Sequence, residues 1–90
     1  MIKHYEISIY GRVQGVGFRY AARNKARELS LSGWVENSPD GSVHAAVQGT
    51  PEACHAFLQW CREGTGYSWV EKVEAEEKSP APFRGFFIRR

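Results

Sequence analysis

The sequence lacks the features that define several large classes of proteins. It has only two cysteines, no Cys-x-x-Cys or His-Glu-x-x-His spacing and three dispersed histidines, which argues against a disulfide scaffold or a zinc site. No apolar run is long enough to cross a membrane, and the N-terminal segment lacks the apolar stretch of a signal peptide. We therefore expect a cytoplasmic protein that uses neither a metal nor a membrane.

The two cysteines, Cys54 and Cys61, fall in a segment whose pattern predicts a helix. The seven-residue separation places their Cα atoms about 10 Å apart along such a helix, beyond the reach of a disulfide bond. Both share a face with Phe57 and Leu58, so we expect buried thiols in place of a redox pair or metal ligands.

Neither positive nor negative residues predominate in the chain. The 12 Lys and Arg residues are scattered among 10 Asp and Glu residues, and the net charge is only +2. Affinity for the phosphate backbone of nucleic acids grows with clustered cations, so this distribution disfavours a nucleic-acid partner. The slight positive bias suits a small anionic substrate instead.

What the chain does have is the composition of one small folded domain. Hydrophobic residues make up 42% of its 90 residues and charged residues 24%, values that are typical of globular proteins. A chain of this length holds one core, so we predict a single domain over residues 1–90, and we expect a monomer. Aromatic residues should supply much of the core, with Trp34 and Trp69 packed against helices.

Hydrophobic periodicity divides the chain into seven elements. It predicts strands over 5–10, 33–37, 43–47, 69–77 and 83–88, and helices over 18–29 and 51–63. This order of elements is typical of the α+β, ferredoxin-like (split βαβ) two-layer sandwich. We therefore predict an antiparallel sheet of four to five strands with two helices on one face.

Turn and cap residues mark the ends of several elements. Thr50, Pro51 and Glu52 form a helix start, with a side-chain cap, a proline in the first turn and an acid that complements the helix dipole. The run Ser38-Pro39-Asp40-Gly41 predicts a hairpin turn. We expect Asp40 to shape this turn and not to act as a catalytic base.

The segment from Gly11 to Arg19 is the most informative one. It places three glycines within residues 11–17, between a predicted strand and a predicted helix. The first N–H groups of a helix lack intrahelical acceptors, and the helix dipole favours an anion there. Composition alone leaves two interpretations open, an oxyanion site and a tight connection that needs glycines for steric reasons. Arg19 favours the oxyanion site, because a guanidinium offers bidentate hydrogen bonds to phosphate oxygens.

The pattern of this segment differs from the common nucleotide-binding loops. It lacks the Gly-Lys-Ser/Thr end of an ATP-type loop and the third glycine of the dinucleotide fingerprint. The expected ligand is therefore a single small phosphoryl group.

Two stretches, residues 11–19 (GRVQGVGFR) and 33–43 (GWVENSPDGSV), closely resemble the signature stretches of the acylphosphatase family. The likeness extends over essentially the whole chain in length, element order and spacing. It implies the ferredoxin-like fold, hydrolysis of the carboxyl-phosphate bond of acyl phosphates to a carboxylate and inorganic phosphate, and no metal or organic cofactor.

The resemblance also assigns roles to residues of this chain. It implies that Arg19 binds the phosphoryl group and that Asn37 orients the attacking water. The loop amides would complete the substrate-binding site, which comprises Gly11, Arg12, Val13, Gln14, Gly15, Val16, Gly17 and Phe18. The chain departs from the family at His44, where an acid is common, and at Thr65, where a proline often follows Gly64. Neither position belongs to the catalytic pair, so we expect only local differences there.

The chemistry needs few residues. The leaving carboxylate is a stable anion, because its conjugate acid has a pKa of about 4. Phosphoryl transfer passes through a loose transition state that requires charge stabilisation and an aligned water. No general acid is required, and inorganic phosphate should act as a product or inhibitor.

Two other functions stay open from the sequence. A non-catalytic module could bind an acyl or carbamoyl phosphate through the same loop, although the presence of Asn37 favours catalysis. A ferredoxin-like RNA-binding domain is the second alternative, because residues 84–87 (RGFF) weakly resemble an RNA-binding motif. That stretch lacks a partner motif, so a small-molecule acyl phosphate is the preferred substrate.

Overall fold

The computed structural model describes residues 1–89 and contains all seven predicted elements. In chain order they are β1 (Lys3–Arg12), α1 (Phe18–Glu28), β2 (Ser32–Asn37), β3 (Val43–Gly49), α2 (Pro51–Glu63), β4 (Trp69–Lys78) and β5 (Phe86–Ile88). The last strand is shorter than predicted, because residues 83–85 form irregular backbone before it.

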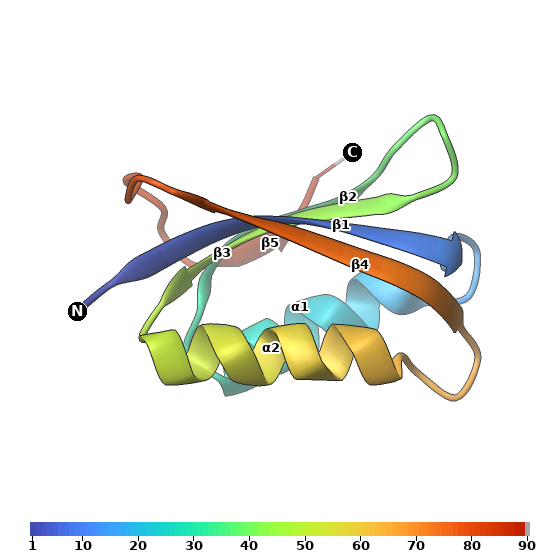
Figure 1. Ribbon diagram of the computed structural model, residues 1–90, viewed down its shortest axis with the longest axis horizontal. Coiled ribbons are helices and arrows are strands. Elements are labelled where there is room, and N and C mark those ends of the chain that lie inside the picture. The colour runs from blue at the N-terminus through green and yellow to red at the C-terminus, as the bar shows by residue number, and fades with distance from the viewer. Residues whose placement is uncertain (90) are drawn as a thin grey trace.

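The strands form one sheet in the order β4-β1-β3-β2-β5. The pairs β4–β1, β1–β3 and β3–β2 are antiparallel, as predicted. The prediction was wrong for β5, which pairs with β2 in parallel and makes the sheet mixed. The physical reason is the route of the chain. The chain leaves β4 at the end of the sheet where β2 begins, and residues 79–85 cross to the opposite edge of the sheet (Figure 1). Because β5 starts at the same end as β2, it runs in the same direction as β2.

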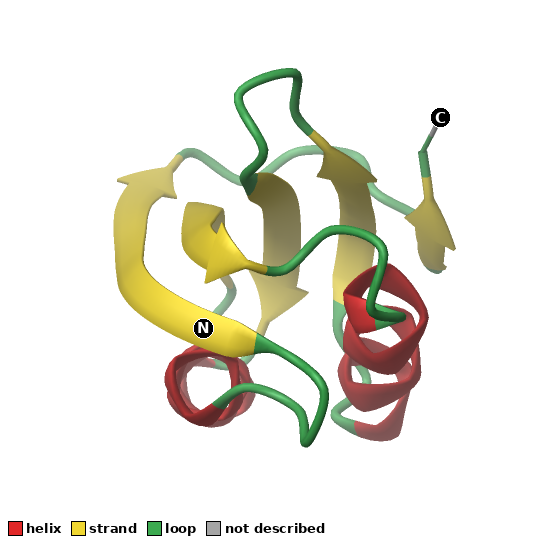
Figure 2. Ribbon diagram, turned by 90° about the vertical axis from the view of Figure 1, so that its right-hand side faces the viewer, coloured by secondary structure: helices red, strands yellow, loops and turns green. Residues whose placement is uncertain are grey.

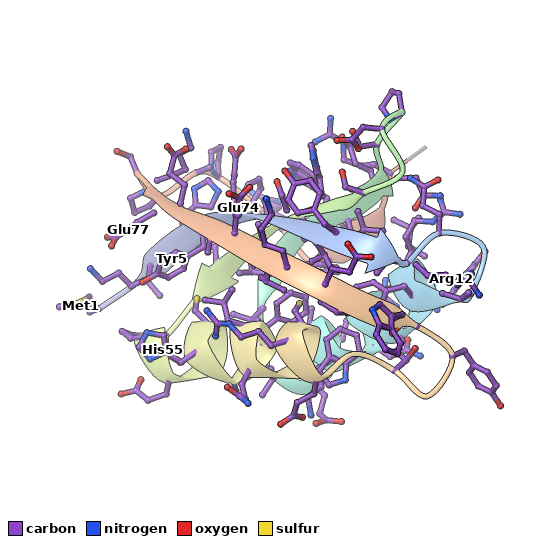
Figure 3. All side chains as sticks on the ribbon, turned by 45° about the vertical axis from the view of Figure 1, so that its right-hand side comes forward. Met1, Tyr5, Arg12, His55, Glu74 and Glu77 are labelled. Carbon is purple, nitrogen blue, oxygen red and sulfur yellow. The ribbon has the colours of Figure 1, made fainter. Side chains whose placement is uncertain are left out.

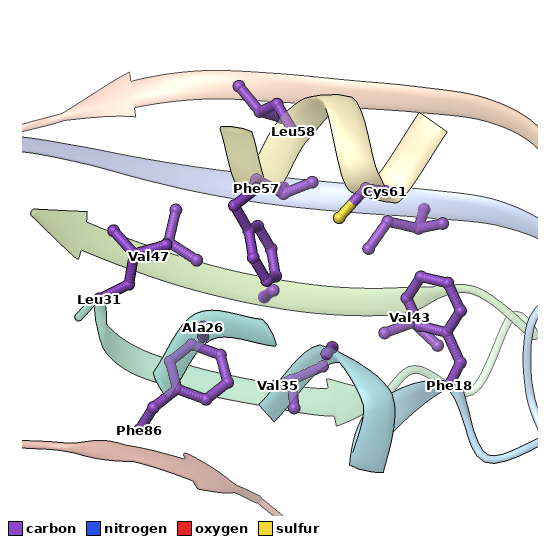
Figure 4. Packing of buried hydrophobic residues seen from close by; sticks show 14 of the residues in the cluster. Phe18, Ala26, Leu31, Val35, Val43, Val47, Phe57, Leu58, Cys61 and Phe86 are labelled. Carbon is purple, nitrogen blue, oxygen red and sulfur yellow. The ribbon is translucent and has the colours of Figure 1, made fainter. Parts of the chain in front are cut away.

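Both helices cover the same face of the sheet (Figure 1), which confirms the two-layer prediction. The core between the layers follows the alternation of β1, β2 and β3, whose inward side chains include Ile7, Val35 and Val47. Figure 4 shows Phe18 from α1 and Phe57 from α2 within this core. The cluster as a whole is formed by Ile7, Ile9, Val13, Phe18, Ala22, Ala26, Leu31, Val35, Val43, Ala45, Val47, Cys54, Phe57, Leu58, Cys61 and Phe86.

The tryptophan that packs against the core is Trp60 of α2, whose ring centroid lies 5.3 Å from that of Phe18 and 5.8 Å from that of Phe57. The expectation that Trp34 and Trp69 pack against helices was wrong. Trp34 precedes the fully buried Val35 on β2, so the two-residue period turns its side chain to the open face of the sheet. Trp69 is 70% exposed at the start of β4.

Both cysteines are free and buried on the inner face of α2, as predicted. Burial raises the pKa of each thiol, because the thiolate would lose its hydration. These thiols are therefore core groups with little nucleophilic character.

One end of the molecule gathers three connections: the β1–α1 loop, the β2–β3 hairpin and the segment that joins α2 to β4 (Figures 1 and 2). The hairpin turn forms as predicted. Asp40 Oδ1 accepts hydrogen bonds from the Ser42 amide at 2.9 Å and from the Ser42 hydroxyl at 2.5 Å. These bonds lower the pKa of the Asp40 carboxyl, so Asp40 serves the turn as an ionised acceptor.

Candidate active site

The loop over residues 13–17 connects the end of β1 to the start of α1. Gly15 and Gly17 adopt φ angles of 75° and 77°, in the left-handed region. A Cβ added at either position would meet no atom within 4 Å, so the backbone angle and not a lack of space requires glycine. Alternation of left- and right-handed residues turns successive N–H groups to one side, as in an anion-binding nest.

The amides of this loop are free of protein acceptors. Within residues 1–89, the N–H groups of residues 15–20 donate to no backbone or side-chain acceptor. Gly17 is the N-cap of α1 and offers no side-chain cap, and the first turn of α1 contains no acidic residue. The site thus combines a run of free donors with the positive end of a helix dipole, which is the arrangement that binds oxyanions.

Arg19 lies in the first turn of α1 and is half-buried. None of the ion pairs within residues 1–89 involves its guanidinium. The contrast with Arg27 on the same helix is informative, since that guanidinium donates two hydrogen bonds to the Phe86 carbonyl at 2.9 and 3.1 Å. Arg27 is a structural residue, whereas the donors of Arg19 are available to a ligand.

Gln14 joins the loop to the β2–β3 hairpin. Its side-chain Nε2 donates to the Ser38 carbonyl at 2.7 Å and to the Ser42 carbonyl at 2.8 Å. Because Ser38 directly follows Asn37, these bonds place the end of β2 beside the loop. The sequence analysis considered only the backbone of Gln14, and no local pattern reveals a side-chain contact across 24 residues.

Asn37 is the last residue of β2, where it pairs with Val43 of β3. Its side-chain Oδ1 is buried and has no hydrogen-bond partner within residues 1–89. An amide oxygen that is buried without a hydrogen-bond donor lowers the stability of the fold by about 1–3 kcal/mol. A group that a folded protein leaves in this state often has a functional role. An acceptor at this place can receive a hydrogen bond from a water molecule.

The other predicted substrate-binding residues play different structural parts. Gly11 and Arg12 still belong to β1, so the loop proper begins at Val13. The side chains of Val13 and Phe18 are buried in the core, so only their backbone can face a ligand. Arg12 is exposed, and its backbone pairs with Trp69 of β4.

Residues 1–89 contain no group of three or more His, Cys, Asp or Glu side chains that could hold an ion. No helix over the same residues is long and apolar enough to cross a membrane.

Comparison with known proteins extends the geometric findings. The model of the family described as Acylphosphatase matches residues 5–88, nearly the whole chain. The chain belongs to the acylphosphatase family. An acylphosphatase of Thermococcus kodakarensis is 44% identical over 82 residues, which cover 91% of this chain and 90% of that protein. An acylphosphatase of Nocardioides sp. is 43% identical over 84 residues, which cover 93% of this chain and 85% of that protein.

The architecture agrees with solved acylphosphatases. The crystal structure of the Bacillus subtilis acylphosphatase superposes with a TM-score of 0.94 at 34% identity, and the match covers 100% of both chains. Family membership and this superposition confirm the predicted ferredoxin-like fold. They also confirm the prediction of an enzyme that hydrolyses acyl phosphates.

Proposed function

We propose that the chain hydrolyses the carboxyl-phosphate bond of small-molecule acyl phosphates at the loop between β1 and α1. In this proposal Arg19 and the loop amides hold the phosphoryl group, and Asn37 orients the attacking water. The observation that carries the proposal is the run of free amide donors over residues 15–20, with the unpaired Arg19 guanidinium in the same turn.

Charge stabilisation is the first task. The phosphoryl oxygens carry negative charge in the substrate and in the loose transition state. Donors that are already aimed at these oxygens need no reorganisation during the reaction, and each such donor typically contributes a factor of about 10²–10³ to the rate. Arg19 adds a planar, permanently charged donor pair to the amides.

Orientation of water is the second task. The Asn37 Oδ1 accepts a hydrogen bond from the water, which leaves an oxygen lone pair directed at phosphorus. The new P–O bond forms as the bond from phosphorus to the bridging oxygen breaks, and the carboxylate leaves with the electron pair. The proton of the water passes to a phosphate oxygen, so no protein acid or base is required.

Gln14 is a positioning residue in this scheme. Its two hydrogen bonds hold the loop, which carries the phosphoryl site, against the strand end that carries Asn37. Correct relative placement matters because a displacement of about 1 Å between reacting groups can cost about 10²-fold in rate.

Several further expectations accompany this function. Inorganic phosphate should compete with the substrate for the same donors. A single domain over residues 1–90, a monomeric state, a cytoplasmic location and activity without a cofactor or nucleic acid stay predictions.

A phosphate titration of ¹⁵N-labelled protein tests the proposed site. We expect saturable NMR shifts in the amides of residues 15–20 and in the side-chain amide of Asn37, together with competitive inhibition of benzoyl phosphate hydrolysis by phosphate. The amides of α2 serve as the internal control and should stay unchanged. Shifts confined to other surfaces, with no effect at residues 15–20, would reject the proposal.

A further inference from the structure

Ser42 lies at the end of the turn between β2 and β3 and is only 2% exposed, although it is polar. Its amide and its hydroxyl both donate to Asp40 Oδ1, at 2.9 and 2.5 Å. Its carbonyl accepts hydrogen bonds from the Ser38 amide at 2.9 Å and from Gln14 Nε2 at 2.8 Å. Ser42 therefore links the carboxylate of the turn to the side chain that joins the hairpin to the loop.

Asp40 restricts the conformation of Ser42 through these two bonds. Asp40 is exposed, so its carboxylate stays hydrated while one of its oxygens accepts both bonds. The bonds from Ser42 lower the pKa of this carboxyl, and the ionised form is the stronger acceptor. With its amide and its side chain both held, Ser42 has little freedom to turn its carbonyl away from Gln14.

Gln14 requires two carbonyls at once. Its side-chain amide has two N–H groups, and Nε2 lies 2.7 Å from the Ser38 carbonyl oxygen and 2.8 Å from that of Ser42. These carbonyls belong to opposite sides of the turn, so they converge on Gln14 only while the turn keeps its shape. Figure 3 shows Arg12, which directly precedes the loop, at the same end of the molecule as the hairpin.

The shape of the turn also determines where Asn37 lies. Ser38 directly follows Asn37 in the chain. Ser42 directly precedes Val43, which pairs with Asn37 across the hairpin. No hydrogen bond within residues 1–89 holds the buried Asn37 Oδ1, so its position depends on the backbone that carries it. A looser turn should therefore displace the acceptor of the attacking water relative to the loop.

We propose that Asp40 is a positioning residue for the reaction, which acts through Ser42 on the contact between the hairpin and Gln14. The inference rests on the proposed function, because it concerns the placement of Asn37 against the phosphoryl site in the loop. Asp40 transfers no proton in this scheme. Loss of its carboxylate should slow the chemical step and leave the loop donors, which bind phosphate, intact.

Steady-state kinetics of two variants at Asp40 test this role. For Asp40→Ala we expect kcat for benzoyl phosphate to fall about three- to tenfold, because the reacting groups are less well placed. The inhibition constant of phosphate should keep its wild-type value. Asp40→Asn keeps an acceptor oxygen for both Ser42 donors and should retain most of the activity. A merely structural role would lower the stability of Asp40→Ala and leave kcat of the folded enzyme unchanged.

A double-mutant cycle with Gln14→Ala tests whether the two residues act through the same contact. In that case Asp40→Ala should add little, and kcat of the double variant should lie within about twofold of that of Gln14→Ala. Multiplied losses would overturn the inference, because the two residues would then act independently. If Asp40→Ala does not fold, Ser42→Ala replaces it in the cycle. This variant removes one of the two bonds to Asp40 and should show a smaller loss of kcat with the same lack of additivity.

Thr65→Ala is the matched control. Thr65 Oγ1 accepts a hydrogen bond from the Tyr67 amide at 3.3 Å, in a turn of the same kind at the same end of the molecule. That turn makes no bond to Gln14, so kcat should keep its wild-type value. A wild-type kcat in Asp40→Ala, or a parallel rise in the phosphate inhibition constant, would overturn the positioning role. Failure of the proposed phosphoryl site is a separate result, because phosphate would then not inhibit the wild-type enzyme.

Discussion

The two helices lie side by side in one layer, yet their N-termini are built in opposite ways. At α2, the Thr50 hydroxyl accepts a hydrogen bond from the Ala53 amide at 3.1 Å, and Glu52 places a negative charge in the first turn. At α1, the N-cap is Gly17, no side chain caps the helix, and the first turn carries Arg19 where an acid would be favourable. Charge and capping that stabilise α2 are therefore absent from α1.

This difference separates a structural helix end from a ligand site. At the N-terminus of α2, the Thr50 side chain caps the Ala53 amide and Pro51 has no N–H group to satisfy, so fewer donors stay free there. The N-terminus of α1 keeps its donors free and adds a cation beside them, which is unfavourable for the isolated helix but favourable for a bound phosphoryl group. Substitutions at the two ends should accordingly affect different properties, activity at α1 and stability at α2.

The largest effect is expected from Arg19→Ala. Loss of the guanidinium should lower kcat/KM for benzoyl phosphate by about 10²- to 10³-fold or more, because a preorganised charged donor disappears. Inhibition by phosphate should weaken in parallel, and both are measured in one absorbance assay. Arg23→Ala, on the same helix, should behave as wild type. Equal activity of the two variants would contradict the special role of the first turn.

A slightly smaller loss is expected from Asn37→Ala. Turnover should fall by about 10²-fold because the water loses its acceptor, while phosphate inhibition should persist, since the loop donors are intact. Steady-state kinetics with and without phosphate separate the two effects, and Asn24→Ala on the surface of α1 is the control. If the variant lost phosphate binding but kept its turnover, the assigned role would be wrong.

An intermediate effect is expected from Gln14→Ala. The variant loses both bonds that join the loop to the hairpin, so kcat should fall by about tenfold as the relative placement of Arg19 and Asn37 loosens. Hydrogen exchange should quicken in both the loop and residues 38–42. A variant that loosened only one of these segments would show that Gln14 does not couple them.

The smallest effect on activity is expected from Thr50→Ala, which removes the cap of α2. Stability should fall by about 1 kcal/mol in urea unfolding, with kcat and KM unchanged because this helix end holds no ligand. Thr50→Ser, which keeps the hydroxyl, should recover the stability. A marked loss of activity would mean that the two helix ends are not independent.

Much of the fold could be predicted from local patterns. The alternation around Ile7 and Ile9 identified β1, the Thr50 cap marked the start of α2, and Asp40 with Gly41 marked the hairpin turn. Each of these signals depends on residues a few positions apart, where backbone geometry and side-chain period act directly. The assignment of α1 and its glycine loop followed from the same kind of local information.

Other features depended on contacts between distant segments. The parallel pairing of β5, the outward orientation of Trp34 and Trp69, and the contact of Gln14 with the hairpin were not predicted. A two-residue period shows that a strand has two faces, but it does not say which one the helices will cover. Similarly, a glutamine in a loop has the same local appearance whether or not distant carbonyls approach it.

Propensity, periodicity and backbone freedom are local properties, so the residues alone specify the elements, their order and the glycine-rich connection that precedes Arg19. The position of the end of β2 against this connection, in contrast, depends on packing between segments that are distant in the chain. Such a placement arises when the whole core is buried, and its free energy depends on all the packed segments together.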